Sequence, residues 1–93
     1  MQNGGVANMR VLSEYCIPYV KVGGYFLAMK GATAKEECDQ AMNAIKLLGG
    51  SLEALDCYDL LDCGARGIIK VKKTSQTLTK YPRNASKISK QPL

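Results

Sequence analysis

The chain has 93 residues, of which 46% are hydrophobic and 23% charged. A chain of this length forms one small domain, and this balance of residue types excludes a disordered or collagen-like chain. A membrane span is also excluded, because Pro18, Lys21 and the Gly23-Gly24 pair interrupt the longest apolar stretch.

Charge is distributed unevenly along the chain. Residues 1–62 hold five basic and eight acidic side chains, a balance of −3, whereas residues 63–93 hold eight basic and no acidic ones, a balance of +8. A segment of one sign attracts a polyanion such as nucleic acid, a membrane surface or an acidic protein. The alternative is that the basic segment is a solubilising tail.

The cysteines do not have the spacing of a metal site. The chain has no histidine, and its four cysteines form no C-x-x-C pair, so neither a zinc site nor a redox motif is expected. Two of them fall on predicted helix faces and no signal peptide precedes them, which predicts buried free thiols in a reducing cytosol. The four are Cys16, Cys38, Cys57 and Cys63.

The first predicted element is a helix over residues 6–20, after a lead-in at residues 1–5. Its apolar side chains recur every three or four residues, which is the spacing of one buried helix face. That face consists of Met9, Leu12, Cys16 and Tyr19. Pro18 lacks a backbone donor and crowds the preceding turn, so it should distort the end of the helix, and Gly23-Gly24 completes the stop.

The next element is an apolar run at residues 25–30 that predicts a strand. Because both of its faces are apolar, we expect it to be covered on both sides, as in the parallel sheets of α/β proteins. Thr33 and Glu36 then match the S/T-x-x-E capping box that starts a helix, and Gly49-Gly50 closes that helix. Its predicted core face is Cys38, Ala41 or Met42, Ile45 and Leu48.

Two strands and a tail complete the chain. Residues 52–61 alternate imperfectly, residues 62–65 form a predicted hairpin turn, and the β-branched run at 67–73 is a second strand. The order is therefore helix, strand, helix, strand, strand, with one β-α-β crossover and an antiparallel last strand. Residues 74–93 are polar, basic and interrupted by prolines, which predicts an extended basic tail after a domain at 1–73.

This order of elements resembles the second half of the class I methyltransferase fold, whose sheet ends with an inserted reversed strand. A more specific resemblance is to the glucose-inhibited division protein B family, also called RsmG. It covers nearly the whole chain, in the family's order and spacing. The matching stretches are VANMRVLSEYCIPYVKVGGYFLAMKG at 6–31, LGG at 48–50, RGIIKVKK at 66–73, KYPR at 80–83 and KQPL at 90–93.

The resemblance implies a Rossmann-like α/β fold and a cytoplasmic enzyme that forms 7-methylguanosine in 16S ribosomal RNA, with S-adenosylmethionine as methyl donor. It covers only the C-terminal part of such an enzyme. The glycine-rich motif that holds the cofactor would lie before Met1, and Gly4 stands where the family has a cofactor-site arginine. We therefore expect this chain alone to contain no catalytic residue, to bind no cofactor and to be inactive.

Two residues on the predicted strands are candidate contacts to the 16S rRNA. Lys30 ends a strand at its carboxyl edge, where open α/β sheets place ligands. The alternative for Lys30 is a side chain that reaches from the strand end into solvent. Arg66 matches a family arginine, and its alternative is a surface ion pair to Asp59 or Asp62.

The tail holds the other RNA candidates. Tyr81-Pro82-Arg83 offers a ring to stack on a base, a fixed backbone and a guanidinium for a phosphate, although Tyr81 and Pro82 would alternatively attach the tail to the domain. The remaining candidates are Lys80, Lys87 and Lys90. Lys70 and Lys72 share one face of the last strand and are expected to be solvated instead.

Two other functions fit the same residues: a stand-alone basic RNA-binding module, and a non-functional remnant of a methyltransferase. The strand at 25–30 is also expected to lack a partner on one side, since half of the family's sheet would be missing. An unpaired strand edge offers free backbone donors and acceptors to another chain, which predicts self-association.

Overall fold

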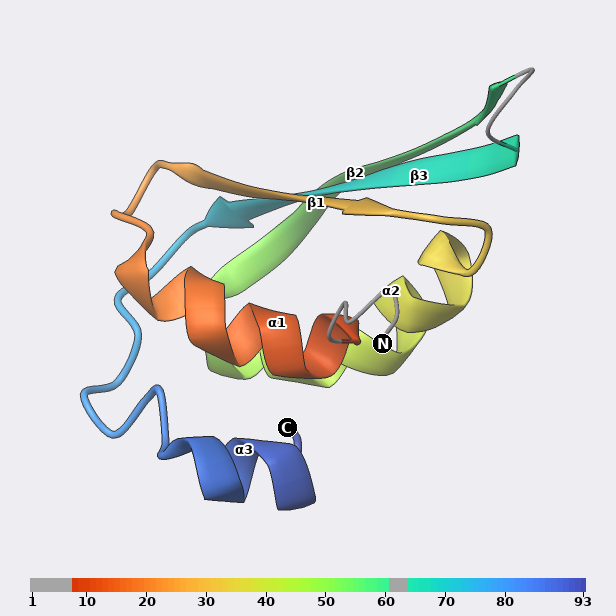
Figure 1. Ribbon diagram of the computed structural model, residues 1–93. Coiled ribbons are helices and arrows are strands. Elements are labelled where there is room, and N and C mark those ends of the chain that lie inside the picture. Colours follow the sequence, from red (N-terminus) through yellow and green to blue (C-terminus); the bar gives the residue numbers. More distant parts are fainter. Residues whose placement is uncertain (1–7, 61–63) are drawn as a thin grey trace.

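The structure, a computed structural model, describes residues 8–60 and 64–93. These residues form an α/β arrangement with a sheet on one side and helices on the other (Figure 1). The strands are β1 (Tyr25–Lys30), β2 (Gly50–Leu60) and β3 (Gly64–Lys73). The helices are α1 (Met9–Cys16), α2 (Ala34–Leu47) and α3 (Ala85–Lys90), with a 3-10 helix at Ile17–Tyr19.

The spatial order of the strands is β1-β3-β2, so the last strand lies between the first two. β3 is antiparallel to both neighbours, and β1 and β2 therefore run parallel to each other. This is the β-α-β crossover and the reversed last strand that the sequence predicts. β1 lies at the edge of the sheet, and β3 is its only partner within the described residues.

The two faces of the sheet differ in how they are covered. α1 and α2 lie against one face, where Ala28 and Ile69 join the buried core (Figure 1). On the other face Tyr25, Leu27 and Met29 of β1 are exposed. The prediction that β1 is covered on both sides is therefore wrong, because the described residues place a helical layer on only one side of the sheet.

α1 begins at an asparagine cap, because the Asn8 side chain accepts a hydrogen bond from the Val11 amide at 3.1 Å. It ends in the 3-10 helix at Pro18, as the sequence predicts. Its buried face differs from the prediction, since Tyr19 is exposed and Glu14 is fully buried. The periodicity of apolar residues could not reveal this, because the carboxylate of Glu14 is buried against a partner from the tail.

The capping box predicted at the start of α2 does not form. The Thr33 side chain caps no helix amide, and its hydroxyl instead donates to the Glu37 carboxylate at 3.0 Å. The rest of the helix agrees with the sequence, because Gly49 closes it with a φ of 89°, in the left-handed region that favours glycine. The predicted core residues Cys38, Ala41, Ile45 and Leu48 are all buried.

The tail is not extended as predicted. Its residues 85–90 form α3, which contacts α1 on the side away from the sheet (Figure 1). Ile88 is fully buried, and Tyr81 and Leu93 pack against the core. Asn84 caps α3 by accepting a hydrogen bond from the Lys87 amide at 2.8 Å. Apolar burial and the cap together offset the entropy lost when the tail is ordered.

Candidate functional site

Lys30 lies at the end of β1, as predicted, but its side chain is only 3% exposed and its ammonium lies 3.1 Å from the Glu37 carboxylate of α2. The alternative in which Lys30 reaches solvent is therefore wrong. Its contact with RNA stays a prediction, and in this arrangement the contact would require the ion pair to open.

Glu37 connects three elements through one carboxylate. Besides the ion pair to Lys30, it accepts a hydrogen bond from the Met9 amide at the start of α1 and another from the Thr33 hydroxyl, both at 3.0 Å. A carboxylate with three donors is an effective structural link between α1, β1 and α2. Sequence reasoning named Glu36 instead, because the capping-box pattern places the acid one residue earlier.

Arg83 is held by Glu14 in a buried ion pair. Its Nε and Nη2 donate to the Glu14 carboxylate at 2.9 and 2.8 Å, and its backbone amide donates to the same group at 2.8 Å. Arg83 Nη2 also donates to the Gln91 carbonyl at 2.8 Å. The guanidinium that was expected to bind a phosphate is thus committed to an internal partner.

The same contacts shift the pKa values of both groups. Hydrogen bonds from the Arg83 side chain hold the pKa of Glu14 below its ordinary value, although burial of the carboxylate opposes this. The hydrogen bond to Glu14 also raises the pKa of Arg83. Glu14 therefore stays ionised in the folded protein, and the ion pair persists at neutral pH.

A second arginine holds the end of the chain. Arg10 Nη2 donates to the Pro92 carbonyl at 2.9 Å, so α1 binds the tail at both ends of α3. The contacts of Arg10 and Glu14 span 82 and 69 residues of sequence. The only sequence feature that relates to these contacts is that Arg10 and Glu14 lie four residues apart, on one face of the helix.

Lys73 is a further cation that sequence reasoning missed. It is buried at the end of β3, and its ammonium donates to the carbonyls of Ile17 at 2.9 Å and Val20 at 2.8 Å. Ile17 begins the 3-10 helix and Val20 follows its last residue, so Lys73 connects both ends of this turn to the end of β3. Burial lowers the pKa of Lys73.

Three predicted tail cations remain exposed: Lys80, Lys87 and Lys90. The Lys80 ammonium lies 5.3 Å from the centroid of the Tyr81 ring. That ring is half-buried against the core, which agrees with the alternative that Tyr81 attaches the tail to the domain.

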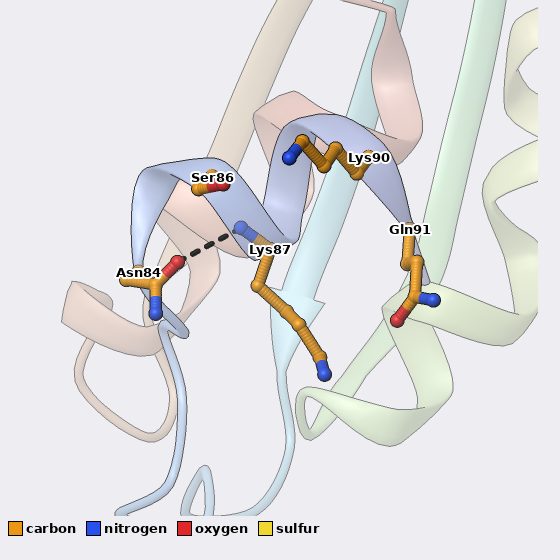
Figure 2. A pocket seen from close by; sticks show the side chains of 5 residues that line it. All are labelled: Asn84, Ser86, Lys87, Lys90 and Gln91. Atoms are coloured by element: carbon orange, nitrogen blue, oxygen red, sulfur yellow. Dashed lines mark hydrogen bonds between the residues drawn. The ribbon is translucent and has the colours of Figure 1, made fainter.

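The surface of α3 is hollowed around these lysines. An open hollow of about 360 Å³ is lined by Asn84, Ser86, Lys87, Lys90 and Gln91. Figure 2 shows the ammonium groups of Lys87 and Lys90 pointing in different directions. The hollow therefore offers two separate cationic contacts rather than one site for a single anion.

Two candidates lie outside what the structure describes. Gly4 precedes the described residues, and the Arg66 side chain, with its predicted partners Asp59 and Asp62, is likewise outside them. The backbone of Arg66 belongs to β3, opposite Tyr58 of β2. Their roles stay predictions.

Cys16 and Cys38 are the cysteines whose side chains the structure describes. Cys38 is buried, Cys16 is half-buried, and both are free thiols. Burial raises the pKa of each thiol, which reduces the fraction of reactive thiolate at neutral pH. The side chains of Cys57 and Cys63 are outside the described part.

The described residues offer neither a metal centre nor a membrane-spanning helix. No group of three or more metal-ligating side chains lies together in residues 8–60 and 64–93. None of the helices in those ranges has the length and hydropathy of a membrane span.

Known proteins match this chain closely. The family described as "GidB: rRNA small subunit methyltransferase G" matches residues 4–61. Proteins named ribosomal RNA small subunit methyltransferase G are 48% identical in Clostridium kluyveri over 88 residues and 44% identical in Clostridium tetani over 89 residues. A protein of that name from Oceanobacillus iheyensis is 48% identical over 89 residues.

The alignments cover nearly all of this chain but only part of each relative. Each includes 95% of this chain but only 37% of the relative. The chain thus spans little more than a third of the length of the relatives that it matches. The sequence resemblance, the reversed last strand and these matches agree, and the chain belongs to the rRNA small subunit methyltransferase G (GidB) family.

Proposed function

We propose that this chain is the C-terminal section of an enzyme that forms 7-methylguanosine in 16S rRNA, in the cytoplasm, with S-adenosylmethionine as methyl donor. The observation that carries the proposal is the match to methyltransferase relatives over 95% of the chain. In this proposal residues 1–73 form the partial methyltransferase domain and residues 74–93 its C-terminal tail. The small ribosomal subunit is the proposed partner.

The described residues do not fit S-adenosylmethionine. β1 leads into α2 through Gly31, Ala32 and Thr33, which is not the glycine-rich turn that brings a backbone close to a cofactor. The acid that follows, Glu37, is engaged by Lys30 and the Met9 amide rather than available for a ribose hydroxyl. We therefore propose that the chain alone is inactive, because residues 8–60 and 64–93 offer no such turn to position a methyl donor.

Isothermal titration calorimetry with S-adenosylmethionine tests this part of the proposal. The Clostridium kluyveri relative at full length should release heat with a micromolar Kd, whereas this chain should give none. A second readout is transfer of a radiolabelled methyl group to 16S rRNA. Micromolar binding of the cofactor by this chain alone would contradict the proposal.

We propose that the tail contacts RNA through its exposed lysines. Lys80, Lys87 and Lys90 are the tail cations that the described structure leaves on the surface, whereas Arg83 is committed to Glu14. When lysines neutralise phosphates, the RNA releases its condensed counterions. The contribution of each lysine therefore appears in the salt dependence of binding.

Neutralising the three tail lysines measures that contribution. The combined variant Lys80→Gln, Lys87→Gln, Lys90→Gln should lower the slope of log affinity against log salt by about 2 for single-stranded RNA. The matched control is Lys21→Gln, Lys35→Gln, Lys46→Gln, which removes three exposed lysines elsewhere. Equal slopes in the two variants would show that the tail lysines have no special role.

RNA binding, measured together with methyltransferase activity after addition of the rest of a relative, separates the other candidate functions. RNA binding without any gain of activity on adding the missing part of a relative favours a stand-alone RNA-binding module. A folded chain that binds neither RNA nor that missing part favours a non-functional remnant. Activity restored by the missing part supports the enzyme section proposed here.

We also propose that the edge of β1 allows self-association. β1 pairs on one side with β3, and its outward residues Tyr25, Leu27 and Met29 carry no charge that would repel another strand. Leu27→Lys should therefore lower the fraction of dimer in sedimentation velocity. Leu78→Lys is the matched control, because Leu27 and Leu78 are both 61% exposed. A wild-type chain that stays monomeric at high concentration would contradict this proposal.

A further inference from the structure

We propose that Glu14 is a positioning residue for the RNA contact of the tail: through Arg83, its buried carboxylate holds α3 against α1, so that the lysines of α3 meet RNA at fixed places. These lysines are Lys87 and Lys90. The inference rests on the proposed function, because it concerns the same tail and the same single-stranded RNA. It goes beyond that function by giving a role in RNA binding to a residue of α1, which lies 69 residues away from Arg83 in sequence.

Arg83 joins α1 to both ends of α3. Its Nε and Nη2 donate to the Glu14 carboxylate at 2.9 and 2.8 Å, and it directly precedes Asn84, the residue that caps the start of α3. Nη2 also donates at 2.8 Å to the carbonyl of Gln91, the cap at the other end. One guanidinium thus fixes both ends of α3, and Glu14 fixes the guanidinium. The Glu14–Arg83 ion pair is called the tail anchor.

α3 is too short to be stable without such contacts. It has six residues, whereas isolated helices of fewer than about 12 residues are marginal in water. Its order therefore depends on tertiary contacts, among them the tail anchor and the fully buried side chain of Ile88. On a disordered tail, Lys87 and Lys90 would have to be ordered when they bind RNA, which costs affinity.

The hollow on α3 is the place where this order matters. Its ends are lined by Asn84 and Gln91, and its two lysines lie between them (Figure 2). Residues 74–93 contain no acid, and Glu14 is fully buried, so the tail anchor adds no exposed negative charge beside the lysines. An RNA strand at the hollow would therefore meet two cations that the fold already holds in place.

Fluorescence anisotropy of Glu14→Gln with a labelled oligouridine tests the inference. The variant keeps every cation and removes one acid, so electrostatics alone would strengthen RNA binding. We expect instead about a tenfold loss of affinity, the cost of ordering two lysine side chains on binding. The slope of log affinity against log salt should stay the same, because the number of cations that neutralise phosphates is unchanged. The control is Glu36→Gln, since Glu36 is an exposed acid whose removal should not weaken binding.

Hydrogen exchange shows whether the carboxylate holds α3. The amides of Ile88 and Gln91 donate to carbonyls four residues earlier, and Glu14→Gln should remove their protection. If the protection stays, Glu14 does not hold α3 and the inference is wrong. Should Glu14→Gln unfold the whole domain, Ile88→Ala decides, because it loosens α3 without changing a charge. It should give the same loss of affinity at the same salt slope, and unchanged affinity would overturn the inference.

The three-lysine variant of the tail separates a failure of this inference from a failure of the proposed function. If that variant lowers the salt slope, but Glu14→Gln exposes the α3 amides without weakening RNA binding, the tail contact stands and the inference is overturned. If the three-lysine variant behaves like its control, the tail contact itself is wrong, and the inference is wrong with it.

Discussion

Neighbouring lysines on β3 have opposite environments on the two sides of the sheet. Lys73 points toward the helices, is buried, and donates to the carbonyls of Ile17 and Val20, at the start and just after the end of the 3-10 helix. Lys72, one residue earlier, lies on the open side and is half-exposed. Successive residues on a strand point to opposite faces of the sheet. The face on which a lysine lies therefore decides whether it stabilises the fold or is accessible to a ligand. The +8 charge of residues 63–93 is therefore larger than the number of cations that are accessible to RNA.

The largest expected effect concerns the ion pair between Glu14 of α1 and Arg83 of the tail. Arg83→Met leaves the buried Glu14 carboxylate without its cation, and only the backbone amide of residue 83 still donates to it. We expect a loss of about 3 to 5 kcal/mol of unfolding free energy. Urea denaturation measures it. Lys87→Met, an exposed cation of the same tail, should change stability by less than about 0.5 kcal/mol.

A double variant identifies the cause of that loss. Glu14→Leu together with Arg83→Met removes both charges, so stability should recover part of what Arg83→Met loses. If the double variant is no more stable than the single one, the loss comes from packing of the tail rather than from an unpaired buried charge.

Lys73 and Lys72 offer the next comparison, one residue apart. Lys73→Met removes the ammonium that donates to the Ile17 and Val20 carbonyls, and we expect a loss of about 1 to 3 kcal/mol. The Ile17 carbonyl keeps the Val20 amide as a donor, so the loss comes mainly from the Val20 carbonyl. Lys72→Met should leave stability nearly unchanged, because its side chain lies on the open face. Equal effects on the urea midpoint would show that the two sides of the sheet do not differ as described.

The smallest expected effect is a pH dependence of the ion pair. Because the folded protein holds the pKa of Glu14 below its unfolded value of about 4.5, this carboxylate stabilises the fold fully above that pH. The contribution is lost as pH falls through the lowered folded value. Glu14→Gln should therefore flatten the decline of the urea midpoint between neutral pH and pH values of about 3. An identical decline in both proteins would assign the acid sensitivity to other carboxylates.

Part of the candidate site followed from local sequence, and part did not. The sequence predicts that Tyr81-Pro82-Arg83 contacts RNA, and this contact stays a prediction. The sequence does not indicate that the Arg83 guanidinium pairs with Glu14, because Glu14 lies 69 residues away in sequence. Lys30 was placed correctly at the strand end, yet its partner Glu37 belongs to the next helix. In both cases the sequence indicates a functional type of residue but not the partner that it binds in the fold.

On the open face of the sheet, the sequence again indicates the residues but not their neighbours. Lys70 and Lys72 were assigned to solvent because they alternate with apolar residues, and the structure does leave them half-exposed. The alternation does not reveal that Tyr25 lies beside them, since the pairing of β1 with β3 joins residues 37 to 47 positions apart in sequence. A register of this kind depends on the whole sheet.

The sequence by itself determined the strands around Leu27 and Ile69, the helix from Ala34 and its end at Gly49, and the family. These features depend on side-chain periodicity and on glycine conformations, which act within a few residues. Only the tertiary structure decided which cations are buried. The carbonyls that bind Lys73 and the carboxylate that binds Arg83 come from 53 to 69 residues away, and packing alone brings them together.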